Sequence, residues 1–297
     1  MRLADLSGRS VAVWGSGRAG RAAVTAIAAH SPSRLIAVDD TVGYLDVPWD
    51  DELAARAPLA GGDHAFGALV SADVVVRTAE VPRDHPWLAV LRERRIRVIG
   101  GDALWMAERA SRTVGVAGGP GATSTATLIG HLLSAVGRPG VVRALGVPLL
   151  DLEESDLYVL ELSGEECAGL AESPRVAVIV SLSPEHSGEL AFLARGPELI
   201  VVNGADQALM AEIKDVRDAS GWAPVAVAAA DSRFRIGPDL FVYASDTRLF
   251  PRDTFARSGE HDAEYLCVAL AVLDGIGVDV VDLRSVVEKA VADFPAE

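Results

Sequence analysis

The sequence contains little lysine and little cysteine. Lysine occurs only at Lys214 and Lys289, so arginine supplies the other positive side-chain charges. The two cysteines, Cys167 and Cys267, exclude a disulfide framework or a cysteine-rich metal site and suit a reducing compartment. No run approaches about 18 consecutive apolar residues, so we expect no membrane-spanning helix. We also find no signal peptide and therefore expect a cytoplasmic protein.

Acidic residues outnumber basic ones in the chain as a whole, 42 to 27. The formal net charge is -15, which excludes nucleic-acid and anionic-membrane binding, because both need clustered lysine and arginine. With 297 residues and 50% hydrophobic content, the chain is long enough for two domains with filled cores.

Short apolar runs alternate with helix-like stretches along the chain. The runs typical of buried strands are 10–14, 35–38, 73–76, 96–99, 114–117, 157–160, 177–180, 199–202 and 225–229. Helical patterns cover 21–29, 85–94, 100–112, 126–136, 262–275 and 282–293. The alternation predicts an α/β fold with two doubly wound parallel-sheet domains. We place a Rossmann-like domain at 1–112 and a P-loop-type domain at 113–297.

The first glycine-rich stretch follows a strand and opens a helix. Its candidate ligand-binding residues are Gly15, Ser16, Gly17, Arg18 and Gly20. Asp39 ends the next strand, at the position where an acid contacts a dinucleotide ribose. This arrangement favours binding of a nucleotide or dinucleotide. The alternative is that the glycines serve only a tight turn and close helix–strand packing.

A second glycine-rich loop follows the strand at 114–117. The phosphate-loop residues are Gly118, Gly119, Gly121, Ala122, Thr123 and Ser124. In such a loop, backbone N–H groups hold phosphate oxygens and a hydroxyl reaches Mg²⁺. The lysine expected after the second glycine of the pattern is missing, because Ala122 occupies its place.

The order of motifs along nearly the whole chain resembles the Mur ligases, most of all the D-glutamate-adding member. The motifs are His85–Leu88, Arg97–Gly100, Gly118–Thr125, Gly146–Asp151, Val159–Ser163, Leu182–His186, Val201–Asn203 and Gly259–His261, together with the first glycine loop. The resemblance implies a first domain that holds a UDP-sugar and a central ATPase domain. It also implies ATP and Mg²⁺ as cofactors, with Thr123, Glu161 and His186 as metal-site residues.

Several positions depart from the family pattern in the second domain. The family carries a carbamylated lysine after the His186 motif, but no lysine lies between His186 and Asn203. The family's asparagines that serve the adenine are replaced by Asp262 and Tyr265, and Ala144 replaces another asparagine.

Loss of a preorganised cation costs on the order of 10²–10⁵ in rate. Arg143 and Arg195 are candidate substitutes, although arginine prefers flat bidentate contacts. We also expect the family's third domain to be absent, because the chain ends after what resembles the last helix of the central domain.

These departures lead to three functional hypotheses. The first is a Mur-ligase-like protein that cannot ligate alone but binds a UDP-sugar or nucleotide, as a pseudoenzyme or a subunit of a complex. The second is a repurposed ATP-dependent carboxylate–amine ligase that works with a partner chain. The third is an NAD-binding redox protein that uses the first glycine loop and Asp39. We expect a homodimer or a complex with another protein.

Overall fold

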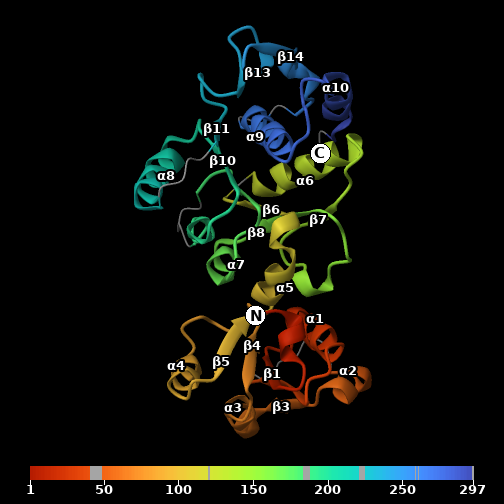
Figure 1. The fold of residues 1–297 in the computed structure, drawn as a ribbon, viewed down its shortest axis with the longest axis vertical. Coiled ribbons are helices and arrows are strands. Elements are labelled where there is room, and N and C mark those ends of the chain that lie inside the picture. Colours follow the sequence, from red (N-terminus) through yellow and green to blue (C-terminus); the bar gives the residue numbers. More distant parts are fainter. Residues whose placement is uncertain are drawn as a thin grey trace. The chain divides into compact units, whose positions relative to one another are not determined.

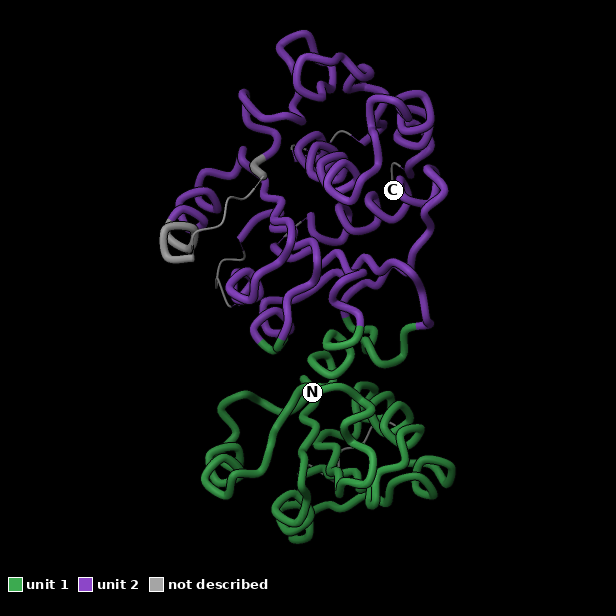
Figure 2. The backbone as a smooth tube through the Cα atoms, in the orientation of Figure 1, with its two compact units in different colours: residues 1–108, 146–152, 169–171 green, residues 109–145, 153–168, 172–297 purple. Residues whose placement is uncertain are grey.

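The structure is a computed structural model that describes residues 1–40, 49–119, 121–182, 188–220, 225–257, 259 and 261–295. The chain forms two compact units (Figure 2). Unit 1 comprises residues 1–108, 146–152 and 169–171, and unit 2 comprises residues 109–145, 153–168 and 172–297. In the described part of the chain, no helix is both long and apolar enough to cross a membrane.

Unit 1 is built around a five-stranded parallel sheet in the order β3-β2-β1-β4-β5 (Figure 1). The strands are β1 (Ser10–Trp14), β2 (Arg34–Asp39), β3 (Leu59–Gly61), β4 (Val74–Arg77) and β5 (Arg97–Gly100). The helices are α1 (Arg18–Ala28), α2 (Asp51–Arg56), α3 (Ala65–Val70), α4 (Pro86–Glu93) and α5 (Gly101–Arg109).

The sheet of unit 1 is buried on both faces. Val11 and Val13 belong to one hydrophobic cluster, which includes Ile27 of α1. Ala12 and Trp14 belong to a second cluster with residues of α3 and α4. Successive residues of a strand point to opposite faces, so helices on both sides explain the continuous apolar run of β1.

Unit 2 contains a six-stranded parallel sheet in the order β11-β10-β9-β6-β8-β7. These strands are β6 (Thr113–Ala117), β7 (Val141–Arg143), β8 (Tyr158–Leu162), β9 (Val176–Ile179), β10 (Leu199–Asn203) and β11 (Val225–Val227). A separate antiparallel sheet consists of β12 (Phe234–Ile236), β13 (Phe241–Ala244) and β14 (Thr247–Pro251). The helices are α6 (Ala122–Ala135), α7 (Gly164–Gly169), α8 (Gln207–Ser220), α9 (Asp262–Gly275) and α10 (Arg284–Asp293).

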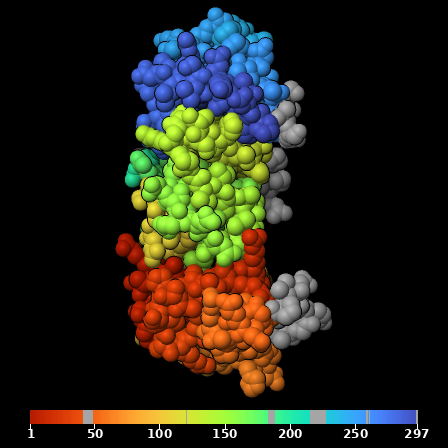
Figure 3. Space-filling model, turned by 90° about the vertical axis from the view of Figure 1, so that its right-hand side faces the viewer, coloured from red at the N-terminus to blue at the C-terminus, as the bar shows by residue number. Residues whose placement is uncertain are grey.

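Helix α9 lies at the centre of the unit 2 core. It packs against α6, β10, β11 and β12, and the residues from Leu266 to Leu273 are all buried. A helix that is apolar all round is typical of such an interior position. Helix α10 covers α6, where the His131 Nε2 atom lies 2.9 Å from the Ala290 carbonyl oxygen. Figure 3 shows the dark-blue C-terminal residues beside the yellow-green residues of α6.

The predicted α/β class with two parallel sheets is confirmed. The strands β3 and β7, the helices α3, α7 and α8, and the antiparallel sheet were not predicted. The single helix predicted at 100–112 is instead α5, which ends at Arg109, followed by a 3₁₀ turn at Ala110–Arg112.

Candidate functional site

The first glycine loop connects the end of β1 to the start of α1 at the carboxyl edge of the unit 1 sheet. Gly15 has φ +112°, a conformation that favours glycine. A Cβ atom on Gly20 would collide with the carbonyl oxygen of Gly15, so this helix position also requires glycine. The backbone conformation and packing therefore explain why glycine occupies both positions, whether or not a ligand binds.

The polar residues of this loop are already paired within the chain. The Ser16 hydroxyl donates to Asp39 Oδ2, and both residues are buried. The Ser16 hydroxyl thus occupies one of the acceptor sites that a dinucleotide ribose would use on Asp39. Arg18, at the first position of α1, is exposed.

A residue that the sequence did not indicate contacts the first loop directly. The Gly17 N–H group donates to Glu80 Oε2 at 3.0 Å, and the Thr78 hydroxyl lies 3.4 Å from the same oxygen. Glu80 follows β4, the neighbour of β1 in the sheet. The sequence signal available was weak, because Glu80 is one acid in an irregular segment after a strand.

The second glycine loop connects β6 to α6 in unit 2. Gly118 has φ +125° and Gly121 has φ +102°. The Gly119 N–H group donates to the Ser181 hydroxyl at 3.1 Å. Ala122 begins α6 and is only 2% exposed, so the position of the missing lysine is occupied by a buried methyl group.

The structure brings two of the three predicted metal-site residues together. The Thr123 hydroxyl donates to Glu161 Oε1 at 2.7 Å, and the Leu145 N–H group donates to Glu161 Oε2 at 3.2 Å. Glu161 lies on β8 and is 6% exposed. His186 lies outside the described residues. In the part of the chain that is described, no group of three or more His, Cys, Asp or Glu residues is arranged to hold a metal ion.

The two arginines proposed as substitutes for the lysine are engaged elsewhere. Arg143 donates to the Glu161 carbonyl oxygen and to Glu166 Oε1, both at 2.6 Å. Arg195 donates to backbone carbonyl oxygens of α7 and of Ala191. These bonds connect both guanidinium groups to residues of α7.

A different arginine reaches the second loop. Arg257 Nη2 lies 3.4 Å from the Ser124 hydroxyl in the first turn of α6, and its Nε lies 3.6 Å from Asp262 Oδ1. Arg257 is 133 residues from Ser124 in the chain, and nothing in its local sequence indicated the contact. Its charge is shared with a carboxylate, so it does not replace a dedicated loop cation.

Tyr265 covers the second loop at Gly121. A Cβ atom on Gly121 would collide with the Tyr265 ring, which shows how closely the ring approaches the backbone. Burial raises the pKa of the Tyr265 phenol, and the carboxylates of Glu264 and Asp262 raise it further. The ring therefore stays neutral at physiological pH.

The strand-end Asn203 is also engaged beside this loop. Its Nδ2 atom donates to Glu264 Oε2 at 2.7 Å, and Asn203 is 3% exposed. His261 Nδ1 lies 3.3 Å from the same Glu264 oxygen. Asn203, Glu264 and His261 thus form an internally bonded cluster.

A magnesium nucleotide fits this second loop poorly as the side chains stand. The Thr123–Glu161 pair offers the hard oxygen atoms that Mg²⁺ prefers. However, the loop lacks its lysine, and the Tyr265 ring lies against Gly121. Both the missing cation and the aromatic ring oppose the binding of a triphosphate.

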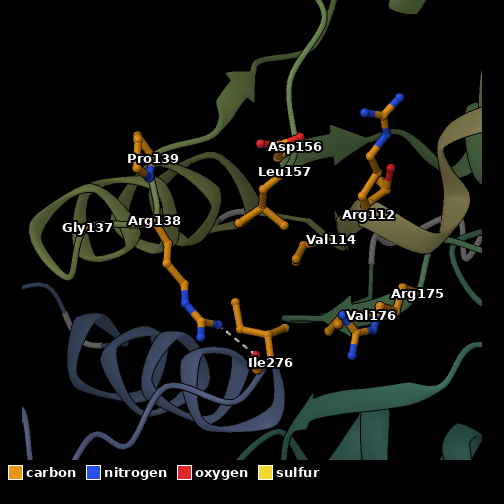
Figure 4. A pocket seen from close by; sticks show the side chains of 11 residues that line it. Arg112, Val114, Gly137, Arg138, Pro139, Asp156, Leu157, Arg175, Val176 and Ile276 are labelled. Atoms are coloured by element: carbon orange, nitrogen blue, oxygen red, sulfur yellow. Dashed lines mark hydrogen bonds between the residues drawn. The ribbon is translucent and has the colours of Figure 1, made fainter.

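A cavity of about 410 Å³ lies elsewhere in unit 2, at the opposite edge of the sheet. It is lined by the amino ends of β6 and β9 and by Leu157, which precedes β8. In Figure 4, Leu157 and Ile276 point into this space, and Arg138 donates to the Ile276 carbonyl oxygen. Parallel α/β sheets carry their ligands at the carboxyl ends of the strands, so we do not assign the function to this cavity.

Comparison with known proteins identifies close relatives. The chain is 51% identical over 308 residues to the UDP-N-acetylmuramoyl-L-alanine–L-glutamate ligase of a Micromonospora species. It is 50% identical over 310 residues to the ligase of the same name from Salinispora tropica. Each alignment covers 99% of this chain, but only 67% and 68% of the respective relatives. Both names specify L-glutamate, the opposite isomer to that of the D-glutamate-adding member that the motifs resemble.

Solved structures agree at the level of the fold. The UDP-N-acetylmuramate:L-alanyl-γ-D-glutamyl-meso-diaminopimelate ligase of Neisseria meningitidis matches with a TM-score of 0.60 at 18% identity. This match covers 97% of the chain and 99% of that structure. No protein-family model matches the chain.

Proposed function

The chain belongs to the Mur ligase family, and we propose that it is a member of the UDP-N-acetylmuramoyl-L-alanine–glutamate ligase group that does not ligate by itself. Its role would be that of a pseudoenzyme or a subunit of a complex, connected with peptidoglycan precursor synthesis. The relatives show the family and support the substrate class, and the second glycine loop supports the proposed loss of activity.

The main support is the state of the second glycine loop. Phosphoryl transfer depends on cations placed to neutralise charge as the γ-phosphoryl group moves. Here Ala122 is buried at the lysine position, and Arg257 shares its charge with Asp262. With the Tyr265 ring against Gly121, the loop has neither the charge nor the open backbone that a triphosphate needs.

The test is an activity assay on the purified chain. ATP, Mg²⁺, UDP-N-acetylmuramoyl-L-alanine and either L- or D-glutamate would be supplied, and phosphate release and amide formation measured. We expect no turnover above the protein-free blank, while the Micromonospora relative serves as the positive control. Clear turnover by this chain alone would disprove the proposal.

The second candidate is an ATP-dependent carboxylate–amine ligase that needs a partner chain. The observation in its favour is that the Thr123–Glu161 pair persists and that Arg257 contacts Ser124. Because the chain spans about two thirds of its relatives' length, the remaining third of a relative is a suitable partner to add. Calorimetry with MgATP would show tight binding only in the presence of that added segment if this candidate is correct.

A further inference from the structure

The segment after β4 is held against the first glycine loop of unit 1. The Thr78 N–H group donates to the Trp14 carbonyl oxygen at 3.0 Å, at the carboxyl end of β1. The Val81 N–H group donates to the Thr78 carbonyl oxygen at 3.3 Å, which turns the chain back. Thr78 is 4% exposed, so this turn is anchored and holds Glu80 beside the loop.

The Glu80 carboxylate fills the hollow above the loop glycines. Its Oε2 atom accepts from the Gly17 N–H group, directly before the eleven-residue helix α1. A Cβ atom on Gly15 would lie 2.9 Å from Oε2, and one on Gly17 would meet Oε1. The two carboxylate oxygens therefore lie in the space that the missing glycine side chains leave open.

That space is where a glycine loop of this type accepts a phosphate. The loop N–H groups and the start of the helix attract an anion, and glycines allow the anion to approach the backbone. A carboxylate and a phosphate need the same donors and repel each other, so they cannot occupy the hollow together. Glu80 is an exposed residue, so its side chain has room to rotate into solvent.

We propose that Glu80 is an internal competitor of the ligand phosphate in unit 1. A nucleoside diphosphate binds the loop between Gly15 and Gly20 only when the Glu80 carboxylate leaves it. This inference rests on the proposed function, because the substrate named for the relatives carries a UDP group, and it is independent of the proposed loss of ligation in unit 2. Glu80 thus determines how strongly the loop accepts a phosphate-bearing ligand.

The test is the binding of UDP to the full chain and to three variants, measured by titration calorimetry. Glu80→Ala removes the competing side chain, and Glu80→Gln removes only its charge. Asp84→Asn is the matched control, because Asp84 is an exposed acid four residues away and its loss changes the net charge equally. Uridine, which lacks phosphate, is the control ligand.

We expect Glu80→Ala and Glu80→Gln to bind UDP at least about tenfold more tightly than the unaltered chain, since a bond to a charged group must otherwise be broken. Asp84→Asn should bind UDP as the unaltered chain does, and the affinity for uridine should change in none of the variants. A purely structural role for Glu80 would alter the melting temperature but not the ratio of UDP to uridine affinity.

Equal UDP affinity in the Glu80 variants and the unaltered chain would overturn the inference, as would an equal gain in Asp84→Asn. A failure of all four proteins to bind UDP would overturn it as well. None of these results depends on ATP hydrolysis or amide formation, so the fate of this inference is distinguishable from that of the proposed loss of ligation.

Discussion

At the residue scale, a side chain from a later part of the sequence lies against each glycine loop. Glu80 accepts from Gly17 in unit 1, and the Tyr265 ring lies against Gly121 in unit 2. Both contacts are with backbone that only glycine leaves accessible. In each unit the loop keeps the shape of a phosphate cradle while one of the chain's own side chains uses the space.

The Gly121–Tyr265 contact gives a prediction about stability. Gly121→Ala should reduce the free energy of unfolding of unit 2 by about 1–3 kcal/mol, because alanine is strained at the positive φ. The new methyl group would also collide with the Tyr265 ring, which should reduce the stability further. Gly137→Ala is the matched control, because Gly137 also has a positive φ but faces open space. Urea denaturation would measure the two losses.

The ring's share of that loss can be isolated with a double mutant. In a Tyr265→Ala background, Gly121→Ala should cost about as much as Gly137→Ala, because only the backbone strain remains. If Gly121→Ala reduces the stability no more than Gly137→Ala while Tyr265 is present, the result would contradict the close approach of the Tyr265 ring to Gly121.

Some residues of the two glycine loops could be predicted from the sequence, and others could not. The glycine loops, Thr123 and Glu161 stand at strand ends, and their positions follow from the apolar runs before them. Glu80, Tyr265 and Arg257 reach the loops from irregular segments or a distant helix. Their contacts depend on turns and on helix packing, which no local pattern encodes.

At the scale of single elements, α9 holds unit 2 together. It packs against α6 and the parallel sheet on one side and against β12 of the antiparallel sheet on another. The middle of the helix has no solvent face to carry charge, which agrees with its apolar sequence from Leu266 to Leu273.

Helix α9 provides the second prediction. Leu270→Ala should lower the free energy of unfolding of unit 2 by about 2–5 kcal/mol, because Leu270 is fully buried and the methyl groups lost leave a cavity. Val286→Ala on α10 is the control, since Val286 is 39% exposed and should change stability by no more than about 0.5 kcal/mol. Denaturant titration checks both, and equal small effects would contradict the central position of α9.

Three of the strands that were not predicted share a physical property. Strands β3, β7 and β12 have three residues each, so their apolar signal is too short to distinguish from a loop. They form because a longer neighbour, such as β2 for β3 or β8 for β7, offers a partner for hydrogen bonding. Long buried strands such as β6 and β10 carry enough apolar residues to be recognised alone.

At the scale of the whole molecule, the three hydrophobic clusters described above each lie inside one unit. The clusters on the two faces of the first sheet consist of unit 1 residues, and the cluster around α9 consists of unit 2 residues. Separate cores favour separate cooperative unfolding. We therefore expect two thermal transitions rather than one.

Unit 1 is not continuous in the sequence, because residues 146–152 belong to it. The 3₁₀ turn Leu149–Asp151 packs on α1, and Leu150 contacts the unit 1 core. A Cβ atom on Gly101 of α5 would lie 3.3 Å from Leu150 Cδ1. A segment that follows unit 2's first helix in the chain thus contributes to the core of the other unit.

This arrangement gives the last prediction, measured by calorimetric melting of three variants. Ile27→Ala in α1 should lower the midpoint temperature of one transition, and Leu270→Ala in α9 should lower that of the other. Leu150→Ala should lower the midpoint of the same transition as Ile27→Ala, although Leu150 lies beyond the start of unit 2 in the sequence. Because Leu150 is partly buried, we expect it to reduce the free energy of unfolding of unit 1 by about 1–3 kcal/mol. If Leu150→Ala instead lowers the transition sensitive to Leu270→Ala, residues 146–152 stabilise unit 2, and the discontinuous first unit is refuted.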